Sequence, residues 1–255
     1  MDSSRSFEGV KTSYPESYQK IFNLHVAIVG IGGVGSWAAE CLARSGVKEI
    51  TLIDHDEVCI SNVNRQVLAL TSTVGRSKVE VLKERLNLIN PNLIVHAKDS
   101  FFDEPNANDL LTSEIDFVID AIDLLHQKTY LISYCYRNSI PLVSTGGCGG
   151  VTDPRNLEIR DLNKCEHDQL LFKVRRELRR KHDFPRGRSP WGIKCVFSKE
   201  RKTFHEIERS CDPFSSETLR RPCETGYGSM MHVTASVGLF AAYTVIDLAT
   251  GRGEV

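Results

Sequence analysis

The stretch VAIVGIGGVGSW, residues 26–37, passes from an apolar run into four glycines within six positions. Gly30, Gly32 and Gly35 have G-x-G-x-x-G spacing, between a strand pattern and the helix pattern of residues 36–44. In that context the first glycine makes a tight turn, the second lets the backbone approach a phosphate, and the third lets helix and strand pack closely. The amides of the helix N-terminus then face the anion. The stretch therefore predicts a nucleotide-binding strand–turn–helix unit.

The following sequence alternates between strand and helix patterns. The predicted strands are residues 26–30, 49–54, 93–97, 116–123, 140–145 and, more weakly, 156–162, and the predicted helices are residues 36–44, 77–90 and 126–138. The strands up to residue 150 are nearly continuous apolar runs, which is typical of a parallel sheet covered by helices on both faces. We therefore predict an α/β fold with a doubly wound, mostly parallel, Rossmann-like sheet. Ligands bind such sheets at the carboxyl ends of the strands.

Two further helical patterns form a C-terminal extension. The first, within residues 168–194, is strongly basic with one apolar edge. The second is the apolar run 229–249, which reaches the length of a bilayer span, ~20 residues. Because that run contains His232, Asp247 and many small residues, it predicts a buried helix of the domain rather than a membrane anchor.

Composition narrows the class of protein. The 255 residues carry a net charge of −1, so any contact with nucleic acid requires a local basic patch rather than an overall positive charge. The eight cysteines form no CxxC pair, which argues against a zinc ribbon and favours a reducing compartment. The first twenty residues contain no apolar segment of a secretory signal, so we expect a cytoplasmic protein.

Charged residues follow the predicted strands at their carboxyl ends. Asp54 lies 19 residues after the last glycine of the motif, where a carboxylate can bind ribose hydroxyls. So far the pattern fits NAD as well as ATP. Arg65 and Lys78 come next, and Asp120 and Asp123 lie at the end of the fourth strand, on the same carboxyl-end rim of the sheet. Hydride transfer does not need two cations and two acids around the phosphates. Adenylyl transfer does, because cations stabilise charge on the α-phosphate and pyrophosphate while a carboxylate holds Mg²⁺.

With these residues the chain resembles the ATP-dependent ubiquitin-activating superfamily, which includes the molybdopterin-synthase and thiamine-pathway adenylyltransferases. The matching segments are GIGGVGSW, LIDHDEV, SNVNRQ, VGRSK and DAID. Within that superfamily the chain is similar to the bacterial tRNA threonylcarbamoyladenosine dehydratases. The segments that carry this closer resemblance are VGIGGVGSWAAE, IPLVSTGG, KCVFS and GYGSMMHVTASVG. The similarity runs from about residue 20 to the end of the chain.

The resemblance implies a tRNA-modifying enzyme. Family members use ATP to adenylate the carboxylate of the threonylcarbamoyl group on an adenosine next to the tRNA anticodon. The activated carboxyl group then cyclises with loss of AMP, which is a net dehydration. The cofactors implied are ATP and Mg²⁺, with a monovalent cation as a further candidate.

The resemblance also implies which residues contact the nucleotide. They are Gly30, Gly32, Gly33, Gly35, Asp54, Asp56, Asn62, Arg65, Gln66, Lys78, Asp120, Ala121 and Asp123. Among them, Arg65 and Lys78 act in catalysis together with Asp123, which is the candidate ligand of Mg²⁺. For Asp120 a structural role at the strand end is an equal alternative. Each charge alone is typical of a solvated surface, so the inference depends on the whole set.

Cys223 is a further catalytic candidate, because it precedes a glycine-rich turn and a helix that can stabilise a thiolate. Intramolecular cyclisation needs no covalent enzyme intermediate, so a partly buried or substrate-lining cysteine is the alternative.

The basic segment predicts a phosphate-binding surface for tRNA, although a solvated helix face is the simpler interpretation. The candidate tRNA-binding residues are Arg175, Arg176, Arg179, Arg180, Lys181, Arg186 and Arg188. Trp191 either stacks on an unpaired base or belongs to the core.

We expect one adenylating domain over residues 1–255. Residues 20–150 form its nucleotide-binding core, and residues 151–255 serve substrate binding and dimerisation. By analogy with the superfamily the chain is a homodimer, and a sulfur-transfer protein is a candidate partner. Three other functions stay open: adenylation of a ubiquitin-like sulfur carrier at its C-terminal glycine, NAD-dependent oxidoreduction, and nucleotide binding without turnover.

Overall fold

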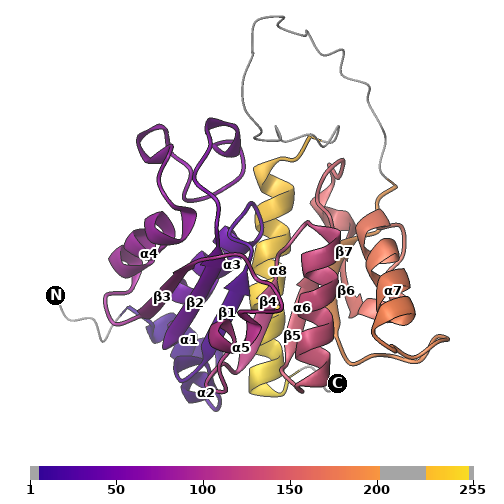
Figure 1. The fold of residues 1–255 in the computed structure, drawn as a ribbon. Coiled ribbons are helices and arrows are strands. Elements are labelled where there is room, and N and C mark those ends of the chain that lie inside the picture. Colours follow the sequence, from indigo (N-terminus) through magenta and orange to yellow (C-terminus); the bar gives the residue numbers. More distant parts are fainter. Residues whose placement is uncertain (1–5, 202–227, 253–255) are drawn as a thin grey trace, which may run out of the picture.

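The computed structural model describes residues 6–201 and 228–252 and contains one seven-stranded sheet (Figure 1). The strands are β1 His25–Val29, β2 Glu49–Asp54, β3 Ile94–Asp99, β4 Phe117–Asp120, β5 Leu142–Thr145, β6 Leu157–Asp161 and β7 Lys194–Ser198. The helices are α1 Glu8–Ser13, α2 Tyr18–Phe22, α3 Gly35–Arg44, α4 Lys78–Ile89, α5 Ala107–Leu110, α6 Leu125–Arg137, α7 Gln169–Lys181 and α8 Met231–Thr250.

The strand order is β3-β2-β1-β4-β5-β7-β6. All neighbouring strands are parallel except β6, which runs antiparallel to β7 at the edge of the sheet. The prediction of a doubly wound, mostly parallel α/β sheet is therefore confirmed. From β1 the chain first extends the sheet toward β3 and then returns to the other side of β1 at β4. This reversal makes the carboxyl ends of β1 and β4 the topological switch point, where such sheets bind ligands.

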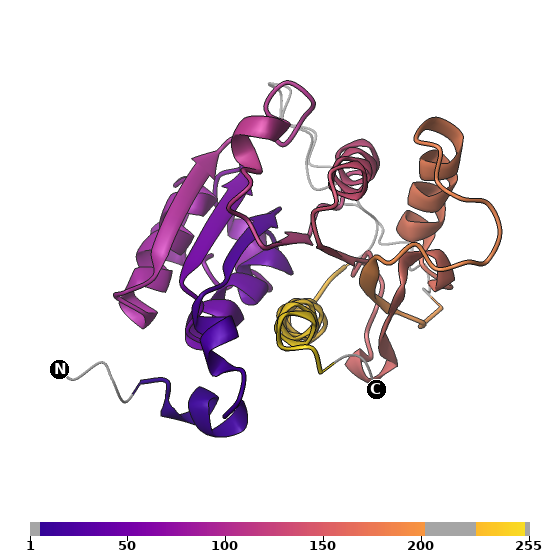
Figure 2. The same cartoon turned by 90° about the horizontal axis from the view of Figure 1, so that it is seen from below.

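Alternate residues of β1 separate the two halves of the core. Val26 and Ile28 face a cluster that includes α3, α4 and α8, whereas Ala27 and Val29 face a cluster that includes α5, α6 and α7. Both clusters consist mainly of buried aliphatic side chains, and the second also contains aromatic residues and cysteines, which explains why all five side chains of β1 are buried. Figure 2 shows α8 end-on, with α6 on the opposite side of the sheet.

The apolar run of residues 229–249 is helix α8, and its small residues have a packing role. A Cβ added at Gly238 would lie 2.4 Å from the carbonyl oxygen of Val34 and 3.0 Å from the amide nitrogen of Ala38. The close crossing of α8 and α3 therefore requires glycine at this position. By length and composition α8 could span a membrane, but 56% of its apolar window is buried within the protein. The prediction of a buried C-terminal helix is confirmed for the face that packs on α3.

Three parts of the fold depart from the sequence prediction. Strand β7, which begins at the last residue of the basic segment 168–194, was not predicted, and neither were α1, α2 and α5. The predicted strand 116–123 ends at Asp120, and the chain then continues as a loop. Trp191 is only 5% exposed and packs against Phe184, so its stacking on an unpaired base is wrong and its place in the core is confirmed.

Candidate functional site

The glycine loop between β1 and α3 lies at the switch point. Gly30 has a φ of +92°, and a Cβ there would lie 2.8 Å from the carbonyl oxygen of Ala121. A Cβ on Gly35 would lie 1.9 Å from the carbonyl oxygen of Gly30. Both positions therefore require glycine, because the loop folds tightly on itself and against the chain that follows β4. The same contacts place Ala121 directly beside the loop.

The two middle glycines have different surroundings. Of the described atoms outside its own neighbours in the chain, a Cβ on Gly32 would approach only the side-chain amide nitrogen of Gln66, at 3.9 Å. Gly32 therefore leaves its backbone open to a ligand. A Cβ on Gly33 would lie 3.2–3.3 Å from atoms of Thr234 and Arg65. Thr234 comes from α8, so the C-terminal helix completes the wall of the loop, which the sequence did not predict.

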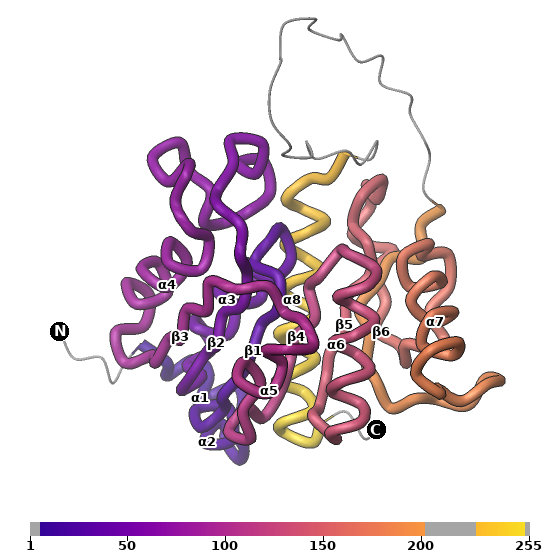
Figure 3. Tube along the Cα trace, viewed as in Figure 1, coloured from indigo at the N-terminus to yellow at the C-terminus, as the bar shows by residue number. Residues whose placement is uncertain are grey.

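Asp54 connects the end of β2 to the glycine loop. One carboxylate oxygen accepts a hydrogen bond of 2.5 Å from the amide of Ile31, and the other accepts one of 2.8 Å from the amide of Asp56. Asp54 thus fixes the loop and the turn after β2, while lying beside the surface where a ribose would bind. Figure 3 shows the chain from β2 to α4 passing over the carboxyl ends of the strands.

Arg65 lies over the glycine loop, and its backbone carbonyl group is fixed there by a hydrogen bond. Its carbonyl oxygen accepts a hydrogen bond of 2.9 Å from the indole nitrogen of Trp37. Its guanidinium donates to the carbonyl oxygen of Ser61 at 2.7 Å and to the side chain of Asn64 at 3.0 Å. These bonds occupy one guanidinium nitrogen, Nη1, so the group retains further N–H donors for an anion.

Asn62 and Gln66, two polar residues close to Arg65 in the sequence, are both buried. Asn62 accepts a hydrogen bond of 3.0 Å from the amide of Cys59, so its oxygen stabilises the loop. Gln66 is 6% exposed, and its side-chain oxygen has no hydrogen-bond partner among the described residues. A buried oxygen of this kind normally has a partner. Gln66 is therefore a candidate to contact a ligand next to Gly32.

Lys78, at the start of α4, pairs with Asp56. The distance between its ammonium nitrogen and the Asp56 carboxylate is 2.7 Å, and the lysine side chain is only 6% exposed whereas that of Asp56 is 53% exposed. The pair links α4 to the turn after β2. The sequence grouped both residues with the nucleotide site, and the structure brings them together at its edge.

Asp120 does not lie on the rim of the sheet, contrary to the sequence expectation. Its side chain is fully buried, pairs with Lys128 at 2.8 Å and accepts a hydrogen bond of 2.7 Å from Ser144. Lys128 is also fully buried and donates to the carbonyl oxygen of Ile122 at 3.0 Å. Asp120 therefore has the structural role that was the alternative. Together with Lys128 it supports the loop that carries Ala121 and Asp123.

Sequence reasoning missed Lys128, although a signal was present. Lys128 lies three, four and seven residues before Leu131, Ile132 and Cys135, which are all buried on one face of α6. A lysine within such an apolar stripe requires a buried acidic partner. Asp123, by contrast, is exposed in the loop after β4, where a carboxylate can reach a cation.

The basic residues of α7 divide into two groups. Arg175 and Arg179 are partly buried; burial lowers the pKa of Arg175, and Arg179 contacts Asn163 and the ring of Trp191. Arg180 and Lys181 pair with Glu177, and hydrogen bonds from Lys181 and Arg180 lower the pKa of Glu177 to about 2. The exposed members of the predicted set are the following: Arg176, Arg180, Lys181, Arg186 and Arg188.

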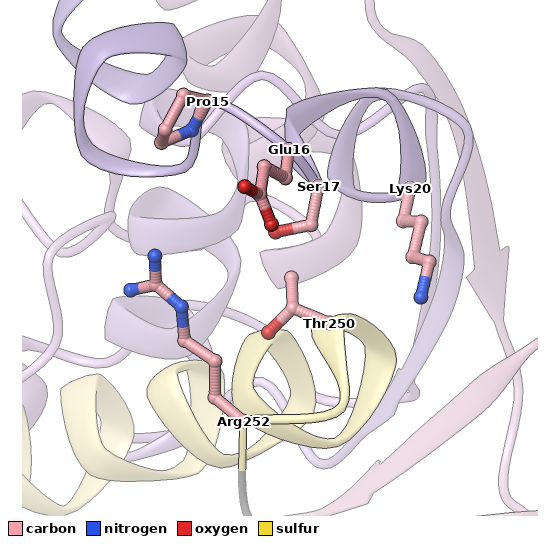
Figure 4. A pocket seen from close by; sticks show the side chains of 6 residues that line it. All are labelled: Pro15, Glu16, Ser17, Lys20, Thr250 and Arg252. Carbon is pink, nitrogen blue, oxygen red and sulfur yellow. The ribbon is translucent and has the colours of Figure 1, made fainter.

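Cys223 falls outside the described residues, so its proposed catalytic role stays a prediction. A pocket between the α1–α2 connection and the end of α8 is lined by the residues shown in Figure 4, which include Lys20 and Arg252. It lies away from the carboxyl ends of the strands.

The fold and the glycine loop between β1 and α3 define a doubly wound α/β protein with a nucleotide-type site at its switch point. The chain belongs to the ThiF family, whose profile matches residues 4–255.

Individual relatives of the chain differ in how much of its length they match. A tRNA threonylcarbamoyladenosine dehydratase of Haemophilus influenzae is 42% identical over 94% of this chain and 92% of its own length. The E. coli tRNA N6-threonylcarbamoyladenosine dehydratase, solved in complex with ATP, superposes with a TM-score of 0.87 at 38% identity over 99% of this chain and 97% of that chain. The E. coli molybdopterin-synthase adenylyltransferase is 38% identical, but over only 47% of each chain.

The buried Asp120–Lys128 pair has a structural role that can be tested directly. Replacing Lys128 with methionine leaves the Asp120 carboxylate buried without its cation, and we expect a loss of about 3–5 kcal/mol of unfolding free energy. Urea unfolding of the purified protein measures it.

Two variants serve as controls for this effect. Lys173→Met, at an exposed position on α7, should change stability by less than about 0.5 kcal/mol. The double variant Asp120→Asn/Lys128→Met should regain part of the loss, because no charge stays buried. A Lys128→Met protein as stable as the wild type would contradict the assigned role.

Proposed function

We propose that this chain is an ATP-dependent tRNA threonylcarbamoyladenosine dehydratase. It adenylates the carboxylate of threonylcarbamoyladenosine at tRNA position 37 and releases AMP as the group cyclises. Support comes from the similarity to dehydratases along nearly the whole chain, including a relative of known structure that binds ATP. Similarity to the molybdopterin-synthase adenylyltransferases, which represent the alternative function, covers between 47% and 62% of the chain.

One observation carries the nucleotide assignment. At the switch point, the open backbone of Gly32 lies near the side-chain amide nitrogen of Gln66, whose buried oxygen has no partner among the described residues, and Arg65 is held over the same loop. An anion next to the loop would meet backbone amides at the N-terminus of α3 and the guanidinium of Arg65. The arrangement fits the phosphates of a nucleotide.

The chemistry needs little beyond positioning and charge stabilisation. A carboxylate is a poor electrophile because of its negative charge, and hydroxide is a poor leaving group even from the protonated acid. Attack of a carboxylate oxygen on the α-phosphorus forms the acyl adenylate and expels pyrophosphate. The nucleophile within the same substituent then attacks the acyl carbon, and AMP leaves. Because this second step is intramolecular, the nucleophile already has a high effective concentration.

We assign a separate role in this reaction to each charged residue of the site. Asp54 orients the ribose, while Arg65 stabilises the charge that develops on the phosphates. Lys78 contributes positive charge from the start of α4 and keeps Asp56 in place. The Asp120–Lys128 pair fixes the loop that presents Asp123.

Asp123 is the candidate to hold Mg²⁺. Its exposed carboxylate offers the hard oxygen ligand that Mg²⁺ prefers, and the adjacent Ala121 touches the glycine loop. Bound there, Mg²⁺ would neutralise charge on the phosphates. A monovalent cation stays a prediction without a residue assigned to it.

We assign tRNA contact to the exposed arginines around α7. Arg176, Arg186 and Arg188 project from the helix and from the segment that follows it, and they carry positive charge on a chain whose net charge is −1. Arg175 and Arg179 support this surface from beneath rather than reaching an RNA. With a tRNA substrate, we expect the activity in the cytoplasm.

We also propose a homodimer. The outer face of α8 exposes Leu239, Phe240 and Tyr243, an apolar surface suited to a second copy of the chain. Residues 20–150 would then bind the nucleotide and residues 151–255 the tRNA and the partner subunit. A sulfur-transfer protein stays a prediction.

Arg65→Ala tests the catalytic assignment. Removing a cation that stabilises the phosphates should lower the rate of AMP release in single turnover by about 100- to 1,000-fold. The reaction uses radiolabelled ATP and total tRNA that carries threonylcarbamoyladenosine.

Arg76→Ala is the matched control, because Arg76 belongs to the same connection between β2 and α4 but pairs with Glu84. It should react within about threefold of the wild-type rate. Equal rates for Arg65→Ala and Arg76→Ala would remove Arg65 from the proposed machinery.

The double variant Arg186→Ala/Arg188→Ala tests the RNA surface. Each lost phosphate contact should reduce the slope of log K against log salt concentration by about 1, so tRNA affinity should fall most at low salt. Filter binding over a series of salt concentrations measures the slope.

The control here is Arg155→Ala, which removes an exposed arginine that pairs with Asp153 in another part of the surface. It should leave the slope unchanged. A wild-type slope in the double variant would exclude Arg186 and Arg188 from the tRNA contact.

A further inference from the structure

A cluster of two histidines and one glutamate lies at the opposite end of the sheet from the glycine loop. His25 is the first residue of β1 and Glu49 the first residue of β2, and they are paired in the sheet register. His96 of β3 pairs with Thr51, two residues after Glu49. Because side chains alternate along a strand, all three project from one face of the sheet. Along β2 the cluster lies about 16 Å from Asp54.

The three side chains converge on a small volume. The ligand atoms of His25, Glu49 and His96 all lie within 4.8 Å of one another. The Glu49 carboxylate is 2.5 Å from Nε2 of His96 and 3.8 Å from Nδ1 of His25. Ligand atoms bound tetrahedrally to zinc at about 2.05 Å would be about 3.3 Å apart. The two distances to Glu49 must therefore change by less than about 1 Å, and the histidine nitrogens, which lie within 4.8 Å of each other, must approach by up to about 1.5 Å; rotation of the side chains can supply these shifts.

The inner histidine already has the orientation of a metal ligand. Its Nε2 and the hydroxyl of Thr51 share a hydrogen bond of 2.8 Å. Its Nδ1 is buried, lies 3.8 Å from the Glu49 carboxylate and makes no hydrogen bond of normal geometry among the described residues, while the backbone of Glu114 lies close enough to the ring to act to raise the pKa of His25. Metal-binding histidines typically use one ring nitrogen for an oxygen partner of this kind and the other for the metal. His25 is 7% exposed, so the unpartnered nitrogen has no ready access to bulk water.

The charge states of the cluster suit a cation. Burial lowers the pKa of His25, against the raising effect of the Glu49 charge, and so favours the neutral ring that binds metals. Burial acts to raise the pKa of Glu49, but the hydrogen bond from His96 and the charges of Lys48 and of the two histidines in their protonated forms outweigh it, so that pKa is lowered in the metal-free protein. The Glu49 carboxylate is therefore ionised at neutral pH. The side chain of His96 is 42% exposed, which leaves a route for an ion from solvent.

We propose that His25, Glu49 and His96 form a binding site for a divalent metal ion of the zinc type, separate from the nucleotide site. Two imidazoles and one carboxylate supply three ligands, and a water molecule would complete the coordination at the exposed side. A bound ion would tie β1, β2 and β3 together at their amino ends. The Thr51 hydroxyl acts as a positioning group for His25.

Zinc affinity of the full-length, untagged, reduced protein tests the proposal. After removal of metals, competition with a chromogenic chelator should reveal one site. His96→Gln and Glu49→Gln should weaken it by roughly 100-fold or more, and Thr51→Val by roughly tenfold. Far-UV circular dichroism shows whether each variant is folded, and His96→Gln, at a half-exposed position, is the least demanding of them.

His55→Gln is the matched control, because His55 belongs to the other group of potential ligands, Asp54–His55–Asp56. It should leave the zinc affinity unchanged. Replacing zinc with Co²⁺ should give a spectrum of nitrogen and oxygen ligands without thiolate charge-transfer bands. The proposal is overturned if the wild type binds no zinc, if His96→Gln binds it as the wild type does, if His55→Gln abolishes binding, or if Co²⁺ shows thiolate ligation.

Discussion

The structure depends on two close backbone contacts of the glycine loop, one between Gly35 and Gly30 within the loop and one between Gly30 and Ala121 after β4. With a side chain at Gly35, the carbonyl group of Gly30 could not keep its place, and with one at Gly30 the loop would collide with Ala121. These two contacts bring β1, α3 and the loop after β4 together at the switch point of the sheet. The backbone amides at the start of α3 are thereby exposed to an anion, and the loop that carries Asp123 is held beside them.

Buried polar groups hold the parts around this loop. Asp54 accepts a hydrogen bond from the loop itself, the Asp120–Lys128 pair lies below the chain that follows β4, and Trp37 fixes the backbone of Arg65. Each connects an element of the sheet or a helix to a segment that would otherwise move freely. Rigid support of this kind is what a site needs when its main task is to place a carboxylate against a phosphate.

The sequence was sufficient to predict the parallel sheet and the glycine loop, because a single unbroken pattern of strand, glycines and helix specifies both. It was also sufficient to predict that Asp54 and Arg65 lie next to the glycine loop. It failed where a role depends on contacts that the folded chain makes. Asp120 has the sequence position of a rim carboxylate, but in the fold it pairs with Lys128 and Ser144 inside the core, and Thr234 reaches the loop only because α8 crosses α3 at Gly238. Strand β7 follows a basic, proline- and glycine-containing segment, so its short apolar pattern did not stand out.

The proposed reaction is tested most directly by the mass of its product. The purified protein is incubated with ATP, Mg²⁺ and tRNA carrying threonylcarbamoyladenosine, and the nucleosides are then analysed by mass spectrometry. We predict that the modified nucleoside becomes lighter by one water, only when ATP is present, with one AMP formed per nucleoside converted. An unchanged nucleoside, with AMP appearing only after addition of a ubiquitin-like protein that ends in glycine, would contradict the dehydratase assignment and favour the adenylyltransferase.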